Sequence, residues 1–147
     1  MKKSFLLFLI VSGITLQFSS CKKDDDTVIP ITTTYSIEGL WRGTYSVDGS
    51  PQLGQQELNL TIKPDGTMVN DSKAGPQQHI ALGAWTLTGD TAFVCTATCV
   101  YGYPNSIGDM QKHTATFSKT TGQLTLCTWI NLPAGTGSGT FTLTKVD

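Results

Sequence analysis

Hydrophobic and polar residues alternate along most of the chain beyond its N-terminal segment, as they do in β-strands that are buried on one face. The clearest case is residues 57–63, whose apolar positions are Leu58, Leu60 and Ile62. Residues 37–47 place Trp41 and Tyr45 together on one face. No segment after Leu16 repeats with the period of a helix. The pattern therefore predicts an all-β domain.

Eight segments of this kind follow one another, and turn-forming residues separate them. We expect strands at residues 35–47, 57–63, 67–72, 80–88, 91–101, 112–118, 123–130 and 140–146. Short turns such as Pro64-Asp65-Gly66 join neighbouring strands, which favours an antiparallel up-and-down meander. An open sheet would leave two unpaired edges, and pairing of the first strand with the last removes both. The sequence thus predicts a closed, eight-stranded antiparallel β-barrel.

Most residues expected to face the barrel interior are large and apolar. They are Trp41, Tyr45, Leu58, Leu60, Ile62, Met68, Trp85, Leu87, Phe93, Phe117, Phe141 and Leu143. The interior of an eight-stranded barrel is either filled by side chains or just wide enough to hold one small ligand. We expect a pocket where the small residues Gly43, Ala97 and Ala115 meet three candidate ligand-binding residues, Tyr45, Trp85 and His113.

The first 20 residues have the pattern of an export signal. Two lysines follow Met1, an apolar run extends over residues 5–16, and two serines precede Cys21. The run of about 12 residues is shorter than the roughly 20 that a membrane-spanning helix needs. We therefore predict a signal peptide over residues 1–20.

Phe18-Ser19-Ser20-Cys21 resembles the lipobox of bacterial lipoproteins. The resemblance implies cleavage before Cys21 and its modification with acyl chains such as palmitate, which would anchor the domain to a membrane. Residues 21–34 then form a flexible linker that opens with a charged run at 22–26. A charged run in this place resembles the signal of lipoproteins displayed on the outer face of the outer membrane. We therefore expect an outer-membrane, cell-surface lipoprotein, with a periplasm-facing anchor as the alternative.

Gly39-Leu40-Trp41 near the start of the first strand, a meander of eight strands and Lys145 late in the last strand resemble the calycins: lipocalins, fatty-acid-binding proteins and avidins. The chain is most similar to the compact lipocalin-like domains of bacterial lipoproteins, over residues 35–147. The resemblance implies that Gly39, Trp41 and Lys145 close the barrel. Because Lys145 falls on the inward face of its strand, we expect a cation–π contact with the Trp41 indole.

Little in the sequence points to nucleic-acid binding or catalysis. Without the signal peptide the chain has eight basic and eleven acidic residues, and the basic residues of the domain are scattered singly. His79 and His113 have no metal-ligand or nucleophile spacing, and the acidic residues belong to turns, strand ends or outward positions. We therefore expect no enzyme activity, no cofactor or metal, and no nucleic-acid partner.

Three cysteines remain in the domain once Cys21 carries lipid: Cys95, Cys99 and Cys127. Cys95 and Cys99 are four residues apart in one expected strand, a separation of about 13 Å that is too long for a disulfide. Three alternatives stay open. The cysteines are buried thiols in the core, or one disulfide involves Cys99, or they take part in a zinc site.

Two functions fit the predicted barrel. In the first, the open end of the barrel binds a small, partly apolar ligand. In the second, side chains fill the barrel and its loops bind a glycan or a protein, with Tyr101 and Tyr103 as a stacking platform. The alternative role for these two tyrosines is to plug the barrel mouth. The sequence leaves the ligand and the oligomeric state open.

Overall fold

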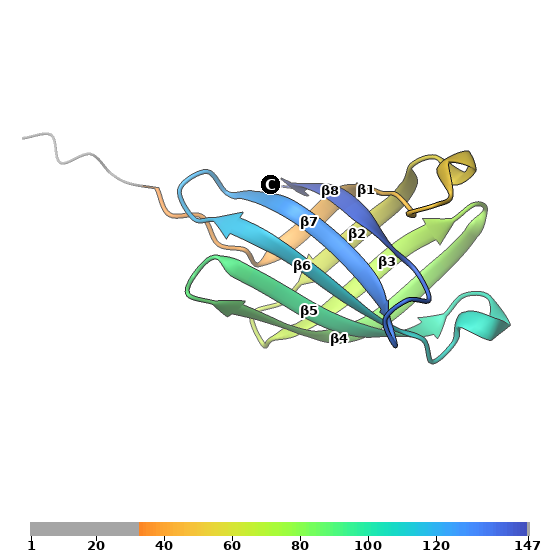
Figure 1. Cartoon of the computed structure of the whole chain (residues 1–147). Helices are drawn as coiled ribbons and strands as arrows, with labels where there is room; N and C mark the ends of the chain where they lie inside the picture. Colours follow the sequence, from red (N-terminus) through yellow and green to blue (C-terminus); the bar gives the residue numbers. More distant parts are fainter. Residues whose placement is uncertain (1–32, 147) are drawn as a thin grey trace, which may run out of the picture. The chain divides into compact units, whose positions relative to one another are not determined.

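The structure is a computed structural model that describes residues 33–146, and it is a closed barrel of antiparallel strands (Figure 1). The strands are β1 (Gly39–Tyr45), β2 (Gln56–Ile62), β3 (Thr67–Ala74), β4 (Gln77–Thr88), β5 (Ala92–Tyr101), β6 (Met110–Ser118), β7 (Gln123–Leu132) and β8 (Ser138–Val146). Each strand pairs with the next, and β8 pairs with β1. The predicted eight-stranded up-and-down barrel is confirmed, and every predicted strand overlaps an observed one.

Two single-turn 3-10 helices interrupt the loops, η1 (Pro51–Leu53) between β1 and β2 and η2 (Pro104–Ser106) between β5 and β6. Within residues 33–146, no helix is long and apolar enough to cross a membrane. The predicted signal peptide, Cys21 and most of the predicted linker at 21–34 lie outside the described residues.

One end of the barrel is closed by packed aromatic side chains and by the chain that leads into β1. Trp41 is fully buried, and its ring meets the Phe117 ring edge-on with centroids 6.3 Å apart. The Trp41 indole N–H donates to the carbonyl of Ile37 at 2.7 Å, and Ile37 is itself buried. The Tyr35 amide donates to the Lys119 carbonyl at 2.8 Å. We call this the closed end.

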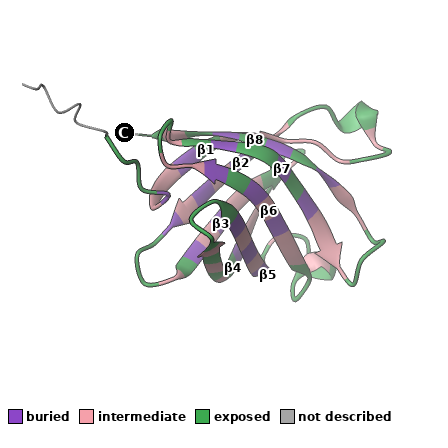
Figure 2. Cartoon of the chain, turned by 60° about the vertical axis from the view of Figure 1, so that its left-hand side comes forward, coloured by how far each residue is buried: buried purple, intermediate pink, exposed green. Residues whose placement is uncertain are grey.

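The alternation read from the sequence places the core correctly. All the residues expected to face inward are buried or pack against the buried cluster, and the buried positions recur along the strands in Figure 2. Residues two apart in a strand share a face, so each strand supplies one row of side chains to the interior. The core therefore follows from the period-2 pattern.

A β-bulge in β5 reverses the expected direction of one candidate residue. Ile80 pairs with Tyr101 and the adjacent Ala81 pairs with Cys99, which leaves Val100 as an extra residue in β5. Strict alternation along the expected strand at residues 91–101 places Tyr101 on the same face as Cys99. This is wrong: beyond the bulge the Tyr101 side chain is 53% exposed, whereas Cys99 is buried.

A second bulge in β7 brings Trp129 inside. Thr114 pairs with Thr128 and Thr116 pairs with Thr125, so Leu126 and Cys127 together lie opposite a single residue of β6. Leu126 takes the left-handed conformation with φ 51° and is 81% exposed. The phase of the strand changes there, and Cys127 and Trp129 are buried.

The seam between β1 and β8 needs a very close approach of the two backbones. A Cβ atom added to Gly43 would lie 1.9 Å from the Thr142 carbonyl oxygen. Trp41 and Lys145 face each other in the register of these strands. The expected cation–π contact is replaced, since the Lys145 ammonium instead donates to the Ser36 carbonyl at 2.8 Å. Lys145 thus ties the segment before β1 to the last strand.

Candidate functional site

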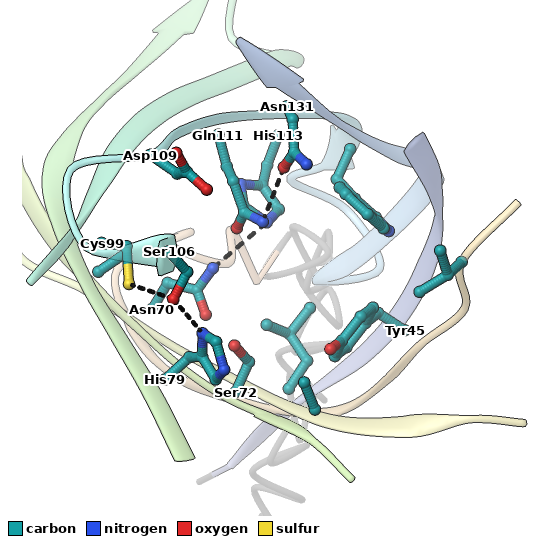
Figure 3. A pocket seen from close by; sticks show the side chains of 15 residues that line it. Tyr45, Asn70, Ser72, His79, Cys99, Ser106, Asp109, Gln111, His113 and Asn131 are labelled. Atoms are coloured by element: carbon teal, nitrogen blue, oxygen red, sulfur yellow. Dashed lines mark hydrogen bonds between the residues drawn. The ribbon is translucent and has the colours of Figure 1, made fainter. Parts of the chain in front are cut away.

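The end of the barrel opposite Trp41 contains a cavity of about 180 Å³ (Figure 3). Sites for drug-sized ligands are usually about 300–1,000 Å³, whereas a cavity of about 150 Å³ suffices for benzene. The volume therefore suits a molecule with one ring or a short chain. We call this end the mouth, because the loops that carry η1 and η2 leave the barrel there (Figure 1).

Apolar and polar side chains both line the cavity. The apolar ones, called the apolar wall below, are Tyr45, Val47, Leu58, Ala74, Ala81 and Trp129. The polar ones, called the polar wall below, include Asn70, Ser72, His79, Gln111, His113 and Asn131. The polar residues come in same-face pairs, such as Asn70 with Ser72 on β3 and Gln111 with His113 on β6. The barrel thus presents hydrogen-bonding groups and hydrocarbon in one cavity that opens at the end of the barrel.

Asn70 and His113 form a buried polar pair in this cavity. Each is only 2% exposed, and Asn70 Nδ2 lies 3.4 Å from His113 Nε2. Burial lowers the pKa of His113 to about 4, so the imidazole is neutral at physiological pH. If the Asn70 NH₂ group donates to Nε2, the ring proton is on Nδ1, and if the amide is turned by 180°, Nε2 carries the proton and donates to the amide oxygen. Asn70 Oδ1 and His113 Nδ1 have no hydrogen-bond partner within the described residues.

Tyr45 and Trp129 make the aromatic part of the apolar wall. Their rings meet edge-on with centroids 5.8 Å apart. The Tyr45 hydroxyl donates to the Lys73 carbonyl at 2.8 Å, and the Trp129 indole N–H donates to the Ser46 carbonyl at 2.9 Å. Burial raises the pKa of Tyr45, so its hydroxyl stays protonated. The Tyr45 hydroxyl and the Trp129 N–H are thus both hydrogen-bonded to backbone carbonyls. The ring faces remain for contact with a ligand.

The loop with η2 is held at the mouth by a chain of side chains. The Ser106 hydroxyl donates to the Tyr103 carbonyl at 2.8 Å and lies 3.4 Å from His79 Nδ1 and 3.8 Å from the Cys99 sulfur. The Tyr103 ring packs edge-on against the His79 ring with centroids 5.4 Å apart. The Ser106 hydroxyl proton is therefore engaged by a backbone carbonyl, and the contacts position the loop rather than activate a nucleophile.

The three cysteines of the domain are buried free thiols. Burial raises the pKa of Cys95 to about 12 and that of Cys127 to about 11. The sequence left three alternatives open for these cysteines, and the structure shows the first of them, buried thiols in the core. Within residues 33–146, no group of three or more His, Cys, Asp or Glu side chains is arranged to hold a metal ion.

The structure brings together only some of the candidate residues. Tyr45 and His113 line the cavity. Trp85 does not, because it follows His79 by six residues in β4, about 20 Å along the strand, and packs on Phe93 with ring centroids 6.4 Å apart. Its indole N–H donates to the Lys63 carbonyl at 2.8 Å. The expectation that Trp85 shares a pocket with Tyr45 and His113 is therefore wrong.

The small residues expected at the pocket also lie elsewhere. Gly43, Ala97 and Ala115 are absent from the cavity wall. Gly43 is used by the β1–β8 seam, while Ala97 and Ala115 are buried nearer the middle of the barrel. Tyr101 and Tyr103 are 53% and 42% exposed and do not line the cavity, so neither plugs the mouth.

Sequence reasoning missed most of the polar wall and Trp129. Asn70 is two residues after the inward-facing Met68, and Gln111 is two residues before His113. The period that placed Met68 and His113 inside thus also pointed to their polar neighbours. Trp129 had no such signal, because the bulge at Leu126 changes the phase of β7 just before it.

Comparison of the chain with models of protein families, with curated proteins and with solved structures found no match in any of the three. The calycin resemblance therefore stays a prediction from the sequence.

Proposed function

We propose that this protein binds a small, neutral, partly apolar molecule in the cavity at the mouth of its barrel. The observation that carries the proposal is the cavity of about 180 Å³, whose lining combines apolar side chains with the buried Asn70–His113 pair. Enclosed sites with apolar walls and a few fixed polar groups are the usual form of small-molecule sites. Binding in such a site is governed by shape, hydrocarbon burial and hydrogen bonding.

The charge of the wall supports a neutral ligand. Asp109 is the only carboxylate among the described residues that line the cavity, and it is exposed at the rim. Neither lysine nor arginine belongs to that set. An anion would have to lose its hydration without gaining a cation, which is costly. A neutral molecule meets no such cost.

The test compares cyclohexanol with cyclohexanecarboxylate, which share a ring and differ in charge at pH 7.5. Titration calorimetry is expected to show binding of cyclohexanol and at least about tenfold weaker binding of the carboxylate. Ala74→Phe should abolish cyclohexanol binding because the added ring fills the cavity. The matched control is Ala84→Phe, which adds the same ring to the exposed outer face of β4. Equal binding by the two variants, or no binding by the wild-type protein at millimolar cyclohexanol, contradicts the proposal.

Trp129 provides a second readout, since it lines the cavity and Trp41 and Trp85 do not. Cyclohexanol should change the intrinsic fluorescence of the wild-type protein. In Trp129→Phe the fluorescence change should disappear while the calorimetric heat remains. A fluorescence change that persists without Trp129 would place the ligand elsewhere.

The outer surface near the mouth supports a second candidate function, a surface that binds a glycan or a protein. Leu82, Val100, Tyr101 and Met110 are 41–53% exposed on adjacent strands, and Ile107 follows in the loop. Exposed apolar groups in one region are typical of interaction sites. Tyr101→Ser with Tyr103→Ser tests this function. Loss of glycan-array or partner binding with an unchanged melting temperature supports it, and unchanged binding rules it out for these tyrosines.

We also propose that Cys21 carries the lipid that attaches the protein to the outer membrane. The supporting observations are the apolar run before Cys21 and the charged run after it. The Cys21→Ala protein should lose its lipid label and leave the membrane fraction. Replacing Asp24, Asp25 and Asp26 with alanine should keep the lipid and change the accessibility of the domain to protease on intact cells. A Cys21→Ala protein that stays with membranes after a high-salt wash contradicts lipid attachment.

A further inference from the structure

The amide of Gln111 is held in one orientation by a short chain of hydrogen bonds. Asn131 Nδ2 donates to the Thr136 carbonyl at 3.4 Å, and Gln111 Nε2 donates to Asn131 Oδ1 at 3.1 Å. A backbone carbonyl only accepts, so the Asn131 NH₂ group faces Thr136 and the Asn131 oxygen faces Gln111. The Gln111 NH₂ group is thereby occupied. Gln111 Oε1 is left as an acceptor of fixed identity.

This oxygen is accessible, and its side chain lines the cavity. Gln111 lies on the inward face of β6, two residues before His113. Gln111 Oε1 accepts no hydrogen bond from the residues that the structure describes, and it does not belong to the side-chain atoms that are shielded from solvent without a partner. A ligand that covers Gln111 Oε1 must therefore bring a donor, because the oxygen would otherwise lose water without replacement.

A second free group lies on another side of the cavity. Ser72 of β3 is half-buried and lines the cavity, and its hydroxyl has no hydrogen-bond partner within residues 33–146. Like Gln111 Oε1, this hydroxyl is not shielded from solvent. β4 and β5 separate β3 from β6 in the barrel, and Figure 3 shows Ser72 and Gln111 on different sides of the cavity. A ligand between them meets a polar group at each end.

Hydrocarbon lines the cavity between these two groups. Trp129, Tyr45 and Leu58 come from β7, β1 and β2, which complete the ring of strands from β6 round to β3. The polar atoms of Trp129 and Tyr45 are bonded to backbone carbonyls. This side of the cavity therefore offers ring faces and methyl groups, which suit the C–H groups of a ligand.

We propose that the ligand is a neutral saturated ring with hydroxyl groups at opposite ends, that is, a cyclic polyol such as the ring of a monosaccharide. One hydroxyl donates to Gln111 Oε1 and another pairs with the Ser72 hydroxyl. The C–H groups of the ring lie against Tyr45 and Trp129. This inference rests on the proposed binding function and adds the chemical class of the ligand.

Other groups fit these two positions less well. A ketone or an ether only accepts, so it leaves Gln111 Oε1 unpaired. A simple alcohol reaches one of the two positions. An ammonium group donates, but Asp109, the one carboxylate in the described lining, is exposed at the rim, where water screens its charge. A hydroxyl donates and accepts without a charge and therefore suits both positions.

The experiment uses three probes with the same ring: trans-1,4-cyclohexanediol, trans-4-methylcyclohexanol and cyclohexanol. The first two differ only in the group at one end, where a methyl replaces a hydroxyl. Calorimetry with the wild-type protein should show about tenfold tighter binding of the diol than of the methyl compound, because the methyl leaves one polar group of the cavity unpaired. Cyclohexanol reports whether the cavity accepts the ring at all.

Two variants test the two positions separately. Gln111→Met keeps the length of the side chain and removes the acceptor, so the preference for the diol should fall close to one. Ser72→Ala should lower the preference in the same way. Gln123→Met is the matched control, because Gln123 is exposed at the start of β7 and does not line the cavity. It should keep the wild-type preference, and all three variants should still bind cyclohexanol.

The outcomes separate this inference from the function on which it rests. If the wild-type protein binds cyclohexanol and shows no preference for the diol, the cavity binds ligands and the polyol class is wrong. The same conclusion follows if Gln111→Met or Ser72→Ala keeps the full preference. If none of the three probes binds, the proposed function itself fails and this inference fails with it.

Discussion

His113 shows how burial alone can make stability depend on pH. Its pKa falls from an ordinary 6.5 to about 4 in the folded protein because the imidazolium would lose its hydration there. The unfolded chain therefore takes up the proton at a higher pH than the folded one. The stabilisation is fully present above about pH 6.5 and is lost as the pH falls toward 4.

We predict that the free energy of unfolding in urea drops by roughly 2 to 3 kcal/mol between pH 7.5 and pH 4.5 because of this residue. His113→Gln should lack that part of the drop, because glutamine does not titrate. His79→Gln keeps His113 and should retain the part of the drop that His113 causes. A drop of the same size in His113→Gln would show that other groups cause it.

The thiols offer a second test at the residue scale. With pKa values of about 12 and 11, Cys95 and Cys127 contain almost no thiolate at pH 8, and all three cysteines are buried. In the Cys21→Ala protein we expect the reaction with Ellman's reagent to be at least about 100-fold slower in buffer than in urea. Urea should then release three reactive thiols. Only one thiol in urea would mean that two of the cysteines are joined.

At the scale of the element, alternation predicts the strands well and their bulges poorly. The period-2 pattern places the eight strands and all the expected core residues, because the two faces of each strand meet different surroundings. A bulge depends on how two strands pair, and a single strand's pattern does not contain that information. The errors follow from this: Tyr101 turns outward beyond the bulge in β5, and Trp129 turns inward beyond the bulge in β7.

The candidate site was predicted in part for a related reason. Tyr45 and His113 were found because they share faces with core residues. Trp85 was misplaced because alternation says which side of a strand a residue faces and not how far along the barrel it lies. His79 and Trp85 face the same side of β4 and lie at different ends of it.

Leu126, in the bulge of β7, has a backbone conformation that is unfavourable for a residue with a side chain. It has φ 51°, where non-glycine residues lose roughly 1–2 kcal/mol, and its side chain is 81% exposed. Leu126→Gly should therefore raise the free energy of unfolding by about 0.5–1 kcal/mol in urea denaturation.

The control for this prediction is Thr125→Gly, at the exposed position just before the bulge. The φ angle of Thr125 is not positive, so glycine relieves no strain at this position and should destabilise the strand. Equal destabilisation by the two variants would show that the conformation of Leu126 carries no strain.

At the scale of the whole molecule, closure of the barrel depends on the seam between β1 and β8. A Cβ atom at Gly43 would lie 1.9 Å from the Thr142 carbonyl oxygen, so the backbones must separate to admit it. Gly43→Ala should lower the free energy of unfolding by about 2 kcal/mol or more, because strain and lost strand pairing add. Opening the seam also exposes two strand edges, which promotes association.

Size-exclusion chromatography and thermal denaturation check this prediction. Gly43→Ala should show a lower melting temperature and added oligomers. Arg42 is the residue before Gly43 and lies on the exposed face of β1, so Arg42→Ala should show neither a lower melting temperature nor added oligomers. A Gly43→Ala protein that is monomeric and as stable as the wild type would mean that the seam can shift without cost.

The direction of the chain at the closed end decides how the barrel can be held. Leu40 pairs with Val146, and the Tyr35 amide bonds to the turn after β6, so the first and last described segments meet at the base, opposite the mouth. A tether before β1 and an affinity tag after β8 would both be attached at the closed end of the barrel. In a protein fixed to a surface by either one, the mouth of the barrel would point away from that surface and the cavity would be open to the solution.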